Sequence, residues 1–350
     1  MASRAASIPA MAKVTVQQVA EHADVSVGTV SNVLNRPERV APKTRARVLR
    51  VIDELGFVRN ESARHLRSGS GRTLGLVLLD LTNPFMTDFA RGVEDRANEA
   101  GYSLIICNSD EDAAKEDAYL TVLEERRVEG MLIVPVAPAS VSARVERLRA
   151  RGTAVVRVTH RGAGEHECGV GVDDVLGGEL AMDHLLGLGH ERIVYVTSAS
   201  HVFPTDERRD GLLRAARRAG KSDDVLREVT VEHLNVAHGR DAGERILGLR
   251  PLPTAVFCAN DLVALGVLQV LIRHGVRVPD DMALMGFDDI EFAAAAAIPL
   301  TSVRQPRQLM GRTAADLLLE EASGDPSHEH RRVVFEPELV VRASTIGNRG

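Results

Sequence analysis

The sequence of 350 residues predicts an α/β protein with an all-α N-terminal segment and a larger core of parallel sheets in two lobes. Two observations support this prediction. The first is a series of short amphipathic segments between residues 13 and 67, with helix-capping residues at their starts. The second is a regular alternation of apolar, strand-like runs with amphipathic helical stretches from Thr73 onward, which is typical of parallel sheets covered on both faces.

Residues 15–35 predict two short helices joined by a tight turn. In the first helix, apolar residues recur at i, i+3, i+4 and i+7, and Thr15 with Gln18 forms a capping box. After the turn, Ser26 is a good N-cap for the second helix, at residues 26–34. This arrangement is a helix-turn-helix, whose second helix, the recognition helix, enters the major groove of DNA.

A third helix is expected from about Pro42 to Leu55, with Gly56 as its stop. Its inward-facing residues are predicted to be Val48, Leu49, Ile52 and Leu55. Residues 13–67 contain ten Lys and Arg against six acids, although the whole chain has a net charge of −6. Such an asymmetry is expected when one small domain meets phosphate and the rest does not. An ordinary solvated basic hairpin is the alternative.

The core is predicted to alternate strands with helices. The expected strands are 74–80, 103–108, 130–135, 153–158, 192–197, 254–259 and 282–287. The expected helices lie near 85–100, 113–127, 140–150, 174–188, 207–219, 238–249 and 260–274. About 270 residues are too many for one open sheet of this kind, so we expect two similar lobes that form a ligand-binding cleft beyond the carboxyl ends of their strands.

Composition and the N-terminus argue against several protein classes. No apolar run approaches the ~20 residues of a membrane-spanning helix. The N-terminal stretch, in which Met1 and Met11 are both candidate starts, lacks the apolar region of a secretory signal, so a cytoplasmic, nucleoid-associated protein is expected. Because Cys107, Cys168 and Cys258 show no CxxC spacing, we expect buried free thiols rather than a disulfide framework.

A family resemblance is found in VQQVAEHADVSVGTVSNVLNRPERVAPKTRARVLRVIDELGFVRNESARHLRSG, which is similar to the DNA-binding headpiece and hinge of the LacI/GalR family of bacterial transcriptional regulators. The stretches PTAVFCANDLVALGVLQVL, VPDDMALMGFDD and PLTSVRQP resemble signatures of that family's periplasmic-binding-protein-like core. The resemblance extends from Lys13 to the C-terminal strands. The expected organisation is a headpiece at 13–59, a hinge helix and linker at 60–72, and a core at 73–346, with lobe 1 at about 73–172 plus 304–331 and lobe 2 at about 173–303 plus 332–346.

The resemblance implies that the start of the recognition helix contacts bases. Val27 would touch a thymine methyl group, Gly28 would allow close approach, and Asn32 would pair bidentately with adenine. Side chains that suit phosphate contacts are Ser26, Thr29, Ser31, Arg36 and Lys43.

Residues 60–67 resemble the family's hinge helix. Leu66 matches the leucine that wedges into the minor groove, Ala63 allows two such helices to approach, and Arg67 would lie along the narrow groove. A helix this short is not stable alone in water, so its order would depend on DNA and on the core. A simple linker is the alternative, because SGSGR at 68–72 has a linker's composition.

The effector site is expected in the cleft between the lobes. The resemblance implies that Phe85 forms an apolar wall, that Arg208 binds hydroxyls or a carboxylate, and that Asn260, Asp261 and Asp288 make polar contacts. Such groups suit a sugar, because each can hold two adjacent hydroxyls. Helix capping by Asp261 or Asp288 is the alternative.

Two features near the end of the 153–158 strand complicate this expectation. Where many relatives have an aspartate, this chain has Thr159 and His160, and the strand itself contains Arg157, so one sugar contact is lost or the ligand differs. Residues 165–168, Glu-His-Glu-Cys, have metal-ligand chemistry but lack the spacing of known sites, so no metal is expected.

The sequence therefore predicts a homodimeric, effector-controlled transcription factor that represses a carbohydrate-utilisation operon, with neither enzymatic activity nor a cofactor. It would bind a pseudo-palindromic double-stranded DNA operator and a small-molecule effector, either a sugar or a sugar derivative. A dimer is expected rather than a tetramer, because no heptad repeat follows the last strands near Val340.

Three alternatives remain open. Within the same family, the effector would be a purine or another non-sugar corepressor, although the absence of Trp and the presence of only three Tyr argue against stacking a flat base. A solute-binding protein would share the two-lobed core but needs a signal peptide. An α/β enzyme needs a nucleophile–base pair or a phosphate loop, and GVGVDD lacks the glycine spacing of a dinucleotide loop.

Overall fold

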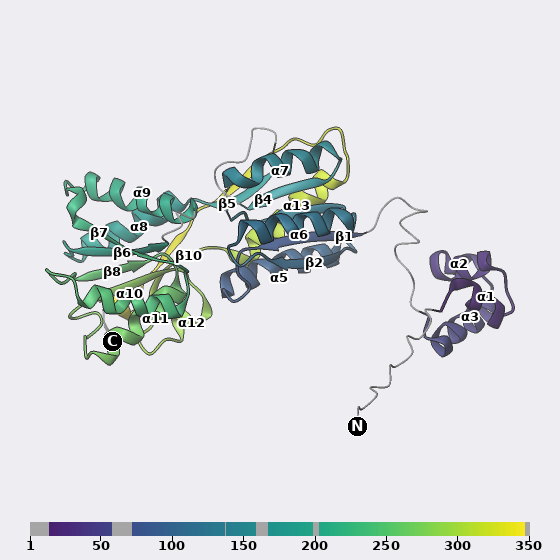
Figure 1. Ribbon diagram of the computed structural model, residues 1–350, viewed down its shortest axis with the longest axis horizontal. Helices are drawn as coiled ribbons and strands as arrows, with labels where there is room; N and C mark the ends of the chain where they lie inside the picture. The colour runs from purple at the N-terminus through teal and green to yellow at the C-terminus, as the bar shows by residue number, and fades with distance from the viewer. Residues whose placement is uncertain (1–13, 58–71, 137, 159–166, 199–202, 347–350) are drawn as a thin grey trace, which may run out of the picture. The chain divides into compact units, whose positions relative to one another are not determined.

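A computed structural model of the chain describes residues 14–57, 72–136, 138–158, 167–198 and 203–346. The chain divides into two compact units, residues 1–71 and 72–350 (Figure 1). The predicted hinge residues Ala63, Leu66 and Arg67, and the pair Thr159 and His160, lie outside the described residues.

The N-terminal unit contains α1 (Val16–His22), α2 (Val27–Asn35), the 3₁₀ turn η1 (Pro37–Arg39) and α3 (Pro42–Leu55). The predicted capping box begins α1, with the Thr15 amide donating to Gln18 Oε1 at 2.8 Å and the Gln18 amide donating to Thr15 Oγ1 at 3.3 Å. Gly56 ends α3 with a left-handed φ of +60°. The three helices enclose one core of Val19, Ala20, Ala23, Val30, Val33, Val48 and Val51.

The prediction that Leu49 faces this core is wrong, because 48% of its surface is exposed. Val51 is buried instead. Residues 48, 51, 52 and 55 stand at i, i+3, i+4 and i+7 and so share one helix face. Residue 49 stands at i+1 and lies outside that face.

The second unit contains two lobes, each built on a six-stranded sheet. The lobe 1 strands are β1 (Thr73–Leu78), β2 (Ser103–Asn108), β3 (Gly130–Ile133), β4 (Ala154–Val158), β5 (Gly169–Val172) and β11 (Arg332–Phe335). The lobe 2 strands are β6 (Ile193–Ser198), β7 (Leu226–Val231), β8 (Ala255–Cys258), β9 (Ala283–Asp288), β10 (Thr301–Arg304) and β12 (Glu338–Val340). The strand orders are β11-β5-β4-β3-β1-β2 and β12-β10-β9-β8-β6-β7, so the first five strands of each lobe follow one topology. All neighbours pair in parallel except β12, which is antiparallel to β10.

Helices cover both faces of each sheet (Figure 1). Lobe 1 contains α5 (Pro84–Glu99), α6 (Ala113–Glu125), α7 (Pro138–Ala150) and α13 (Arg307–Ala322). Lobe 2 contains α8 (Asp174–Gly187), α9 (Phe203–Arg218), η2 (Asp223–Val225), α10 (Val236–Leu247), α11 (Asp261–Arg273), α12 (Glu291–Ala294) and α14 (Ala343–Ile346). Alternate strand residues face opposite layers: Leu76 belongs to the cluster with α5 and α13, and Val77 to the cluster with α6 and α7. The predicted two-lobed α/β core is confirmed.

Several strands and helices of the core were not predicted. β5, with the sequence GVGV, and the edge strand β7, with the sequence LREVTV, lack a continuous apolar run. The strand β10 has only four residues. The helix α13 follows it, beyond the last strand that was predicted. The predicted return to lobe 2 at residue 332 was too early, because β11 pairs in parallel with β5 from Arg332 to Phe335.

Close helix pairs stabilise each lobe. In lobe 2, a Cβ atom at Gly178 of α8 would lie 2.0 Å from the Arg208 carbonyl oxygen, and one at Gly211 of α9 would lie 2.0 Å from the Val175 carbonyl oxygen. The α5–α13 and α10–α11 pairs use the same arrangement, with a glycine from each helix at the crossing. Backbone therefore meets backbone at these crossings, and any side chain would separate the helices.

The three cysteines are free and buried, as predicted. Among the helices in the described ranges, none is both long and apolar enough to cross a membrane.

Candidate functional site

The recognition helix α2 presents the predicted base-contacting residues to solvent. Ser26 begins the helix by accepting a hydrogen bond from the Thr29 amide at 3.1 Å, and the two hydroxyls lie 2.9 Å apart. Val27, Gly28 and Asn32 are exposed. Because Val30 and Val33 hold the opposite face in the core, the exposed face is available to a partner.

The predicted phosphate-contacting residues lie on α2, at its two caps and at the start of α3. Arg36 follows the last turn of α2, Lys43 lies in the first turn of α3, and both are exposed. Ser31 is half-buried, and its hydroxyl and carbonyl oxygens lie 3.2 and 2.8 Å from the Asn35 amide nitrogen. The part of this unit that the structure describes therefore combines an exposed helix start with exposed cations, which suits DNA.

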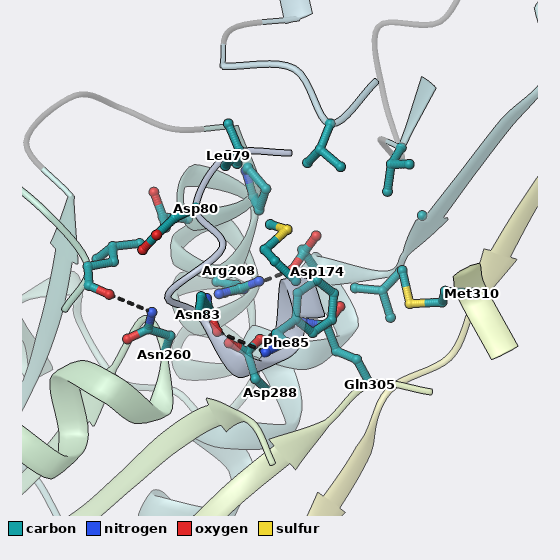
Figure 2. A pocket seen from close by; sticks show the side chains of 18 of the residues that line it. Leu79, Asp80, Asn83, Phe85, Asp174, Arg208, Asn260, Asp288, Gln305 and Met310 are labelled. Carbon is teal, nitrogen blue, oxygen red and sulfur yellow. Dashed lines mark hydrogen bonds and ion pairs between the residues drawn. The ribbon is translucent and has the colours of Figure 1, made fainter. Parts of the chain in front are cut away.

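A second site is a cavity of about 140 Å³ between the two lobes (Figure 2). Its walls come from the carboxyl ends of strands in both sheets: Leu79 follows β1, Val172 ends β5, Asp288 ends β9 and Gln305 follows β10. This is the position at which α/β folds of this kind bind ligands.

Four of the five predicted effector-binding residues, Phe85, Arg208, Asn260 and Asp288, line this cavity. The fifth, Asp261, does not line it and is fully buried. Its carboxylate accepts hydrogen bonds from Ser302 Oγ at 2.7 Å and from the Ile290 amide at 2.9 Å. We therefore correct that expectation: Asp261 connects β10 to the segment after β9, and its burial raises its pKa well above the usual range.

Arg208 is held in place from several sides. Its Nε donates to Asp174 Oδ1 at 2.8 Å, and its Nη1 donates to the Ala259 carbonyl. The guanidinium carbon lies 3.5 Å from the centre of the Phe287 ring, a cation–π contact in a buried environment. These contacts orient the guanidinium at the cavity wall before any ligand arrives.

Asp288 has an unusual backbone as well as an unusual environment. Its φ is +100° and that of Asp289 is +51°, conformations that favour glycine, so the turn after β9 is strained. Gln305 Nε2 donates to Asp288 Oδ1 at 2.7 Å. Burial raises the pKa of Asp288 to about 6, although Arg208 and the Gln305 hydrogen bond act in the opposite direction.

Asn260 combines two roles. Its Oδ1 accepts from the Val263 amide at 2.9 Å and so caps α11, and its Nδ2 donates to the Leu234 carbonyl at 2.9 Å. A ligand in the cavity would meet an amide whose orientation is already fixed.

Comparison with known proteins identifies the family. Residues 15–60 match the model described as "Bacterial regulatory proteins, lacI family", and residues 182–345 match "Periplasmic binding protein-like domain". The "HTH-type transcriptional repressor PurR" of Photobacterium profundum is 32% identical over 339 residues, which cover 94% of this chain and 98% of that protein. The chain belongs to the lacI family.

Two solved structures of LacI-family proteins extend this comparison. The lac repressor dimer bound to operator and the anti-inducer ONPF has a TM-score of 0.82 at 25% identity, over 96% of this chain and 100% of that chain. A LacI family transcriptional regulator from Enterococcus faecium with bound ribose has a TM-score of 0.71 at 28% identity, over 78% of this chain and 98% of that one. This LacI-family chain is thus a DNA-binding transcriptional regulator with an effector-binding core.

Several cavity residues of this LacI-family protein were missed from the sequence. Asp174 directly follows the N-cap of α8 and was assigned only to a helix start, and Gln305 follows a strand that was not predicted. Glu111 and Glu207 also line the cavity. The rule that ligands lie beyond the carboxyl ends of strands finds Asp174 and Gln305 only after β5 and β10 are known.

Arg157, which marked a departure from the family pattern, is not among the residues that line the cavity. It is buried, and its Nε donates to Glu167 Oε2 at 2.9 Å while its Nη1 donates to Ser142 Oγ at 3.1 Å. Val158, the next residue of β4, lines the cavity instead.

Two contacts join the lobes of this LacI-family core beside the cavity. Arg307 Nε donates to Asp88 Oδ2 of lobe 1 at 2.9 Å, and its Nη1 donates to the carbonyls of Asp288 and Asp289 in lobe 2, each at 2.7 Å. Glu111 of lobe 1 lies 3.3 Å from His233 Nδ1 of lobe 2. A change in the angle between the lobes must therefore rearrange charged groups.

Proposed function

We propose that this LacI-family protein acts as a homodimer on a pseudo-palindromic operator and represses a carbohydrate-utilisation operon. Its effector would be a neutral, polyhydroxylated molecule of monosaccharide size, bound in the cavity between the lobes. The observation that supports this proposal most is the set of charged groups around the cavity.

Carboxylates dominate the described residues that line the cavity. There are five of them, against a single cation, Arg208: Asp80, Glu111, Asp174, Glu207 and Asp288. Arg208 already pairs with Asp174, so a phosphate or carboxylate on the ligand would meet net negative charge. Hydroxyl groups suit this cavity better, because they donate to carboxylates and accept from a guanidinium.

The size and the apolar wall support the same ligand class. A cavity of about 140 Å³ is smaller than the ~300–1,000 Å³ of sites for drug-sized ligands. Phe85 is the one aromatic side chain among the described lining residues, and the apolar face of a sugar ring can pack against a single ring. The ribose-bound relative is consistent with this assignment.

A purine is the second candidate. It is favoured by the PurR relative, whose identity to this chain extends over 339 residues. A purine could stack on Phe85, but it offers fewer donors to the surrounding carboxylates than a polyol does.

The homodimer is inferred from the family. The lac repressor structure that resembles this chain is a dimer bound to its operator. Two identical headpieces related by a twofold axis would recognise two half-sites of a pseudo-palindrome.

The test is fluorescence anisotropy of the full chain on DNA from its own upstream region, titrated with pentoses, hexoses and purine bases. We expect salt-dependent binding to one palindrome, and a shift of about 5–150-fold in operator affinity with one sugar. Loss of binding would define an inducer, and a gain would define a corepressor. A response to purines alone would overturn the sugar assignment, and a lack of specific binding under every condition would overturn the operator model.

Asn32→Ala tests base contact within this assay. We expect it to weaken operator binding by about 1–3 kcal/mol and to relax specificity at one base pair. Asn35→Ala is the matched control on the same helix, because the Asn35 amide bonds to Ser31. Equal losses for both variants would contradict the assignment of Asn32 as the residue that contacts the base.

A further inference from the structure

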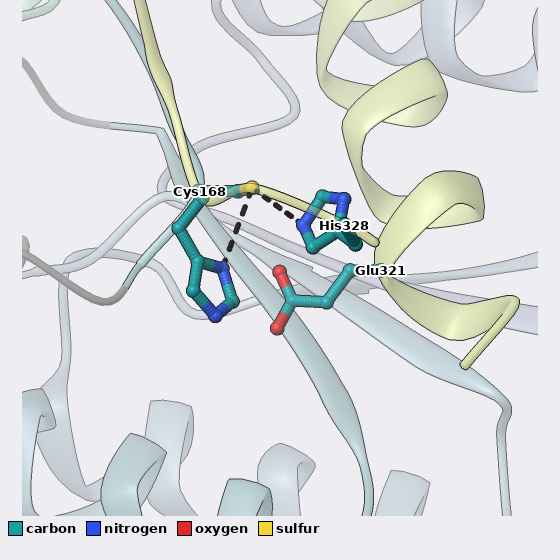
Figure 3. Close-up of side chains that lie close together, drawn as sticks. Cys168, Glu321 and His328 are labelled. Carbon is teal, nitrogen blue, oxygen red and sulfur yellow. Dashed lines mark hydrogen bonds between the residues drawn. The ribbon is translucent and has the colours of Figure 1, made fainter. Parts of the chain in front are cut away.

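Four side chains with metal-binding chemistry converge at the edge of the lobe 1 sheet, apart from the cavity (Figure 3). They are Cys168, Glu321, His328 and His330, and each contributes one donor atom within 4.8 Å of the others. Cys168 precedes β5, Glu321 lies in the last turn of α13, and the two histidines lie in the segment that leads into β11. The sequence had pointed only to residues 165–168, because the histidines follow about 160 positions later.

We propose that these four side chains bind one Zn²⁺ ion. Thiolate and imidazole ligands together select zinc among the common divalent ions, and a carboxylate commonly completes a tetrahedral site. A set of one Cys, two His and one Glu offers two negative charges when the thiol is deprotonated, which would neutralise the ion.

The sulfur–nitrogen distances fit this assignment. Cys168 Sγ lies 3.3 Å from His328 Nε2 and 3.7 Å from His330 Nδ1. Tetrahedral zinc, with Zn–S of about 2.3 Å and Zn–N of about 2.05 Å, places sulfur and nitrogen roughly 3.5 Å apart. Both separations lie within about 0.2 Å of that value, so one ion would contact all three atoms after small side-chain movements.

Glu321 supplies a carboxylate oxygen suited to the fourth position. Its Oε1 lies 3.3 Å from Arg149 Nη2 and 3.4 Å from the Val155 amide nitrogen. Its Oε2 is buried and has no hydrogen-bond partner among the residues that the structure describes. A buried carboxylate oxygen without a partner is costly, and coordination of a cation would satisfy it.

A second carboxylate lies near one of the histidines. His328 presents Nε2 to the sulfur, and its Nδ1 lies 3.9 Å from Glu320 Oε2. Metal-bound histidines usually direct the other ring nitrogen toward a carboxylate or carbonyl, which fixes the ring and raises its basicity. The exposed position of His330 would give an ion a route into the site.

The proposed ion would connect β5, α13 and the segment before β11. That segment leads into β11, the last strand of lobe 1 before the chain crosses to β12 in lobe 2. Zinc would therefore stabilise lobe 1 and restrict the strand from which the final crossover begins.

The test uses untagged full-length protein, stripped with a chelator and then titrated with Zn²⁺ and, separately, Co²⁺. We expect one equivalent of zinc to bind and to raise the Tm. Bound Co²⁺ should give tetrahedral d–d bands and a sulfur-to-cobalt charge-transfer band. Cys168→Ser should remove the charge-transfer band, and His330→Ala, at an exposed position, should weaken zinc affinity at least about tenfold.

Cys107→Ser is the matched control, because Cys107 is another buried free cysteine. It should retain stoichiometry, affinity and the cobalt spectrum. If the unmodified protein binds less than one equivalent, the four side chains form only hydrogen bonds and the proposal fails. It also fails if Cys168→Ser and His330→Ala bind zinc as tightly as the unmodified protein.

Discussion

Gln305 Nε2 donates a hydrogen bond to Asp288 Oδ1 at 2.7 Å, and this bond joins the crossover after β10 to the end of β9. Both residues line the cavity, so the contact connects a cavity-lining carboxylate to one of the segments that join the lobes. A ligand that competes for Asp288 would change this contact. The crossover therefore has a direct means of responding to the ligand.

Effector affinity should depend on pH through Asp288. Burial raises the pKa of this carboxyl to about 6, so it is ionised above that pH and protonated below it. If a ligand hydroxyl donates to the carboxylate, affinity should be constant above pH 7 and should fall as pH drops through 6, by at most about tenfold per unit. Calorimetric titrations at pH 5, 6, 7 and 8 measure the effector affinity.

Asp288→Asn is the control. It should give weaker and pH-independent binding, and an unchanged pH profile in that variant would exclude Asp288 as the titrating group.

The stability of the unliganded protein should show the opposite trend. Because the pKa of Asp288 is higher in the folded chain than in the unfolded chain, the folded state binds the proton more tightly. This contribution to the free energy of unfolding, on the order of 3 kcal/mol, is complete below about pH 4 and is lost as pH rises through about 6. Urea denaturation of the parent and of Asp288→Asn across this range should give curves that diverge. Parallel curves would contradict a raised pKa.

Arg208→Gln should destabilise the core and abolish effector binding. The change removes the guanidinium that pairs with buried Asp174, and breaking a buried ion pair costs about 3–5 kcal/mol. Arg217→Gln is the control on the same helix, because its pair with Asp223 is exposed and screened by solvent, so its loss should change the free energy of unfolding much less. Urea denaturation compares the two. Adding Asp174→Asn to Arg208→Gln should recover part of the loss, and similar losses in both single variants would contradict this account.

Gly178→Ala should loosen the α8–α9 pair. The added Cβ would lie 2.0 Å from the Arg208 carbonyl oxygen, so the helices must separate, at a cost of about 1–3 kcal/mol or more. Gly187→Ala is the control in the same helix, because its Cβ would meet no atom within 4 Å and alanine favours the helix. A lower Tm for the first variant and an equal or higher Tm for the second are expected. Because Arg208 lies at this contact, effector affinity should also fall in Gly178→Ala alone.

Gly28→Ala should change stability and operator affinity in opposite directions. The nearest atom to the added Cβ would be Ser26 Oγ at 3.5 Å, an ordinary contact, and alanine stabilises a helix by about 0.5–1 kcal/mol relative to glycine. Hydrogen exchange in α2 of the full chain should therefore slow. Operator affinity should fall if the missing side chain at this position permits close approach to the bases. Unchanged or tighter operator binding would show that position 28 does not lie against DNA.

The sequence predicted the headpiece well because its signals are local. A capping box at Thr15, an N-cap at Ser26 and a glycine stop at Gly56 each act within a few residues, and all three appear in the structure. Leu49 was assigned to the buried face because apolar periodicity alone locates the boundary of that face only to within about one residue.

The cavity was predicted less completely because it depends on strand ends. Phe85, Arg208, Asn260 and Asp288 were inferred from family motifs and do line it. Asp261 was inferred from the same motifs, but consecutive residues at a helix start point in different directions, and its carboxylate turns into the core. Gln305 was missed because β10, with four residues, gives too short an apolar pattern to detect.

The strand β1 determines how the effector can act. Leu79, just after its carboxyl end, lines the cavity, and the segment toward the headpiece joins its opposite end at Thr73. Six residues of extended chain span roughly 20 Å, so a small ligand beside Leu79 cannot touch Thr73 at the other end of β1. A ligand in the cavity can therefore reach Thr73 only by displacing lobe 1 as a whole, and such a displacement would grow with the distance between Thr73 and the pivot of the lobes.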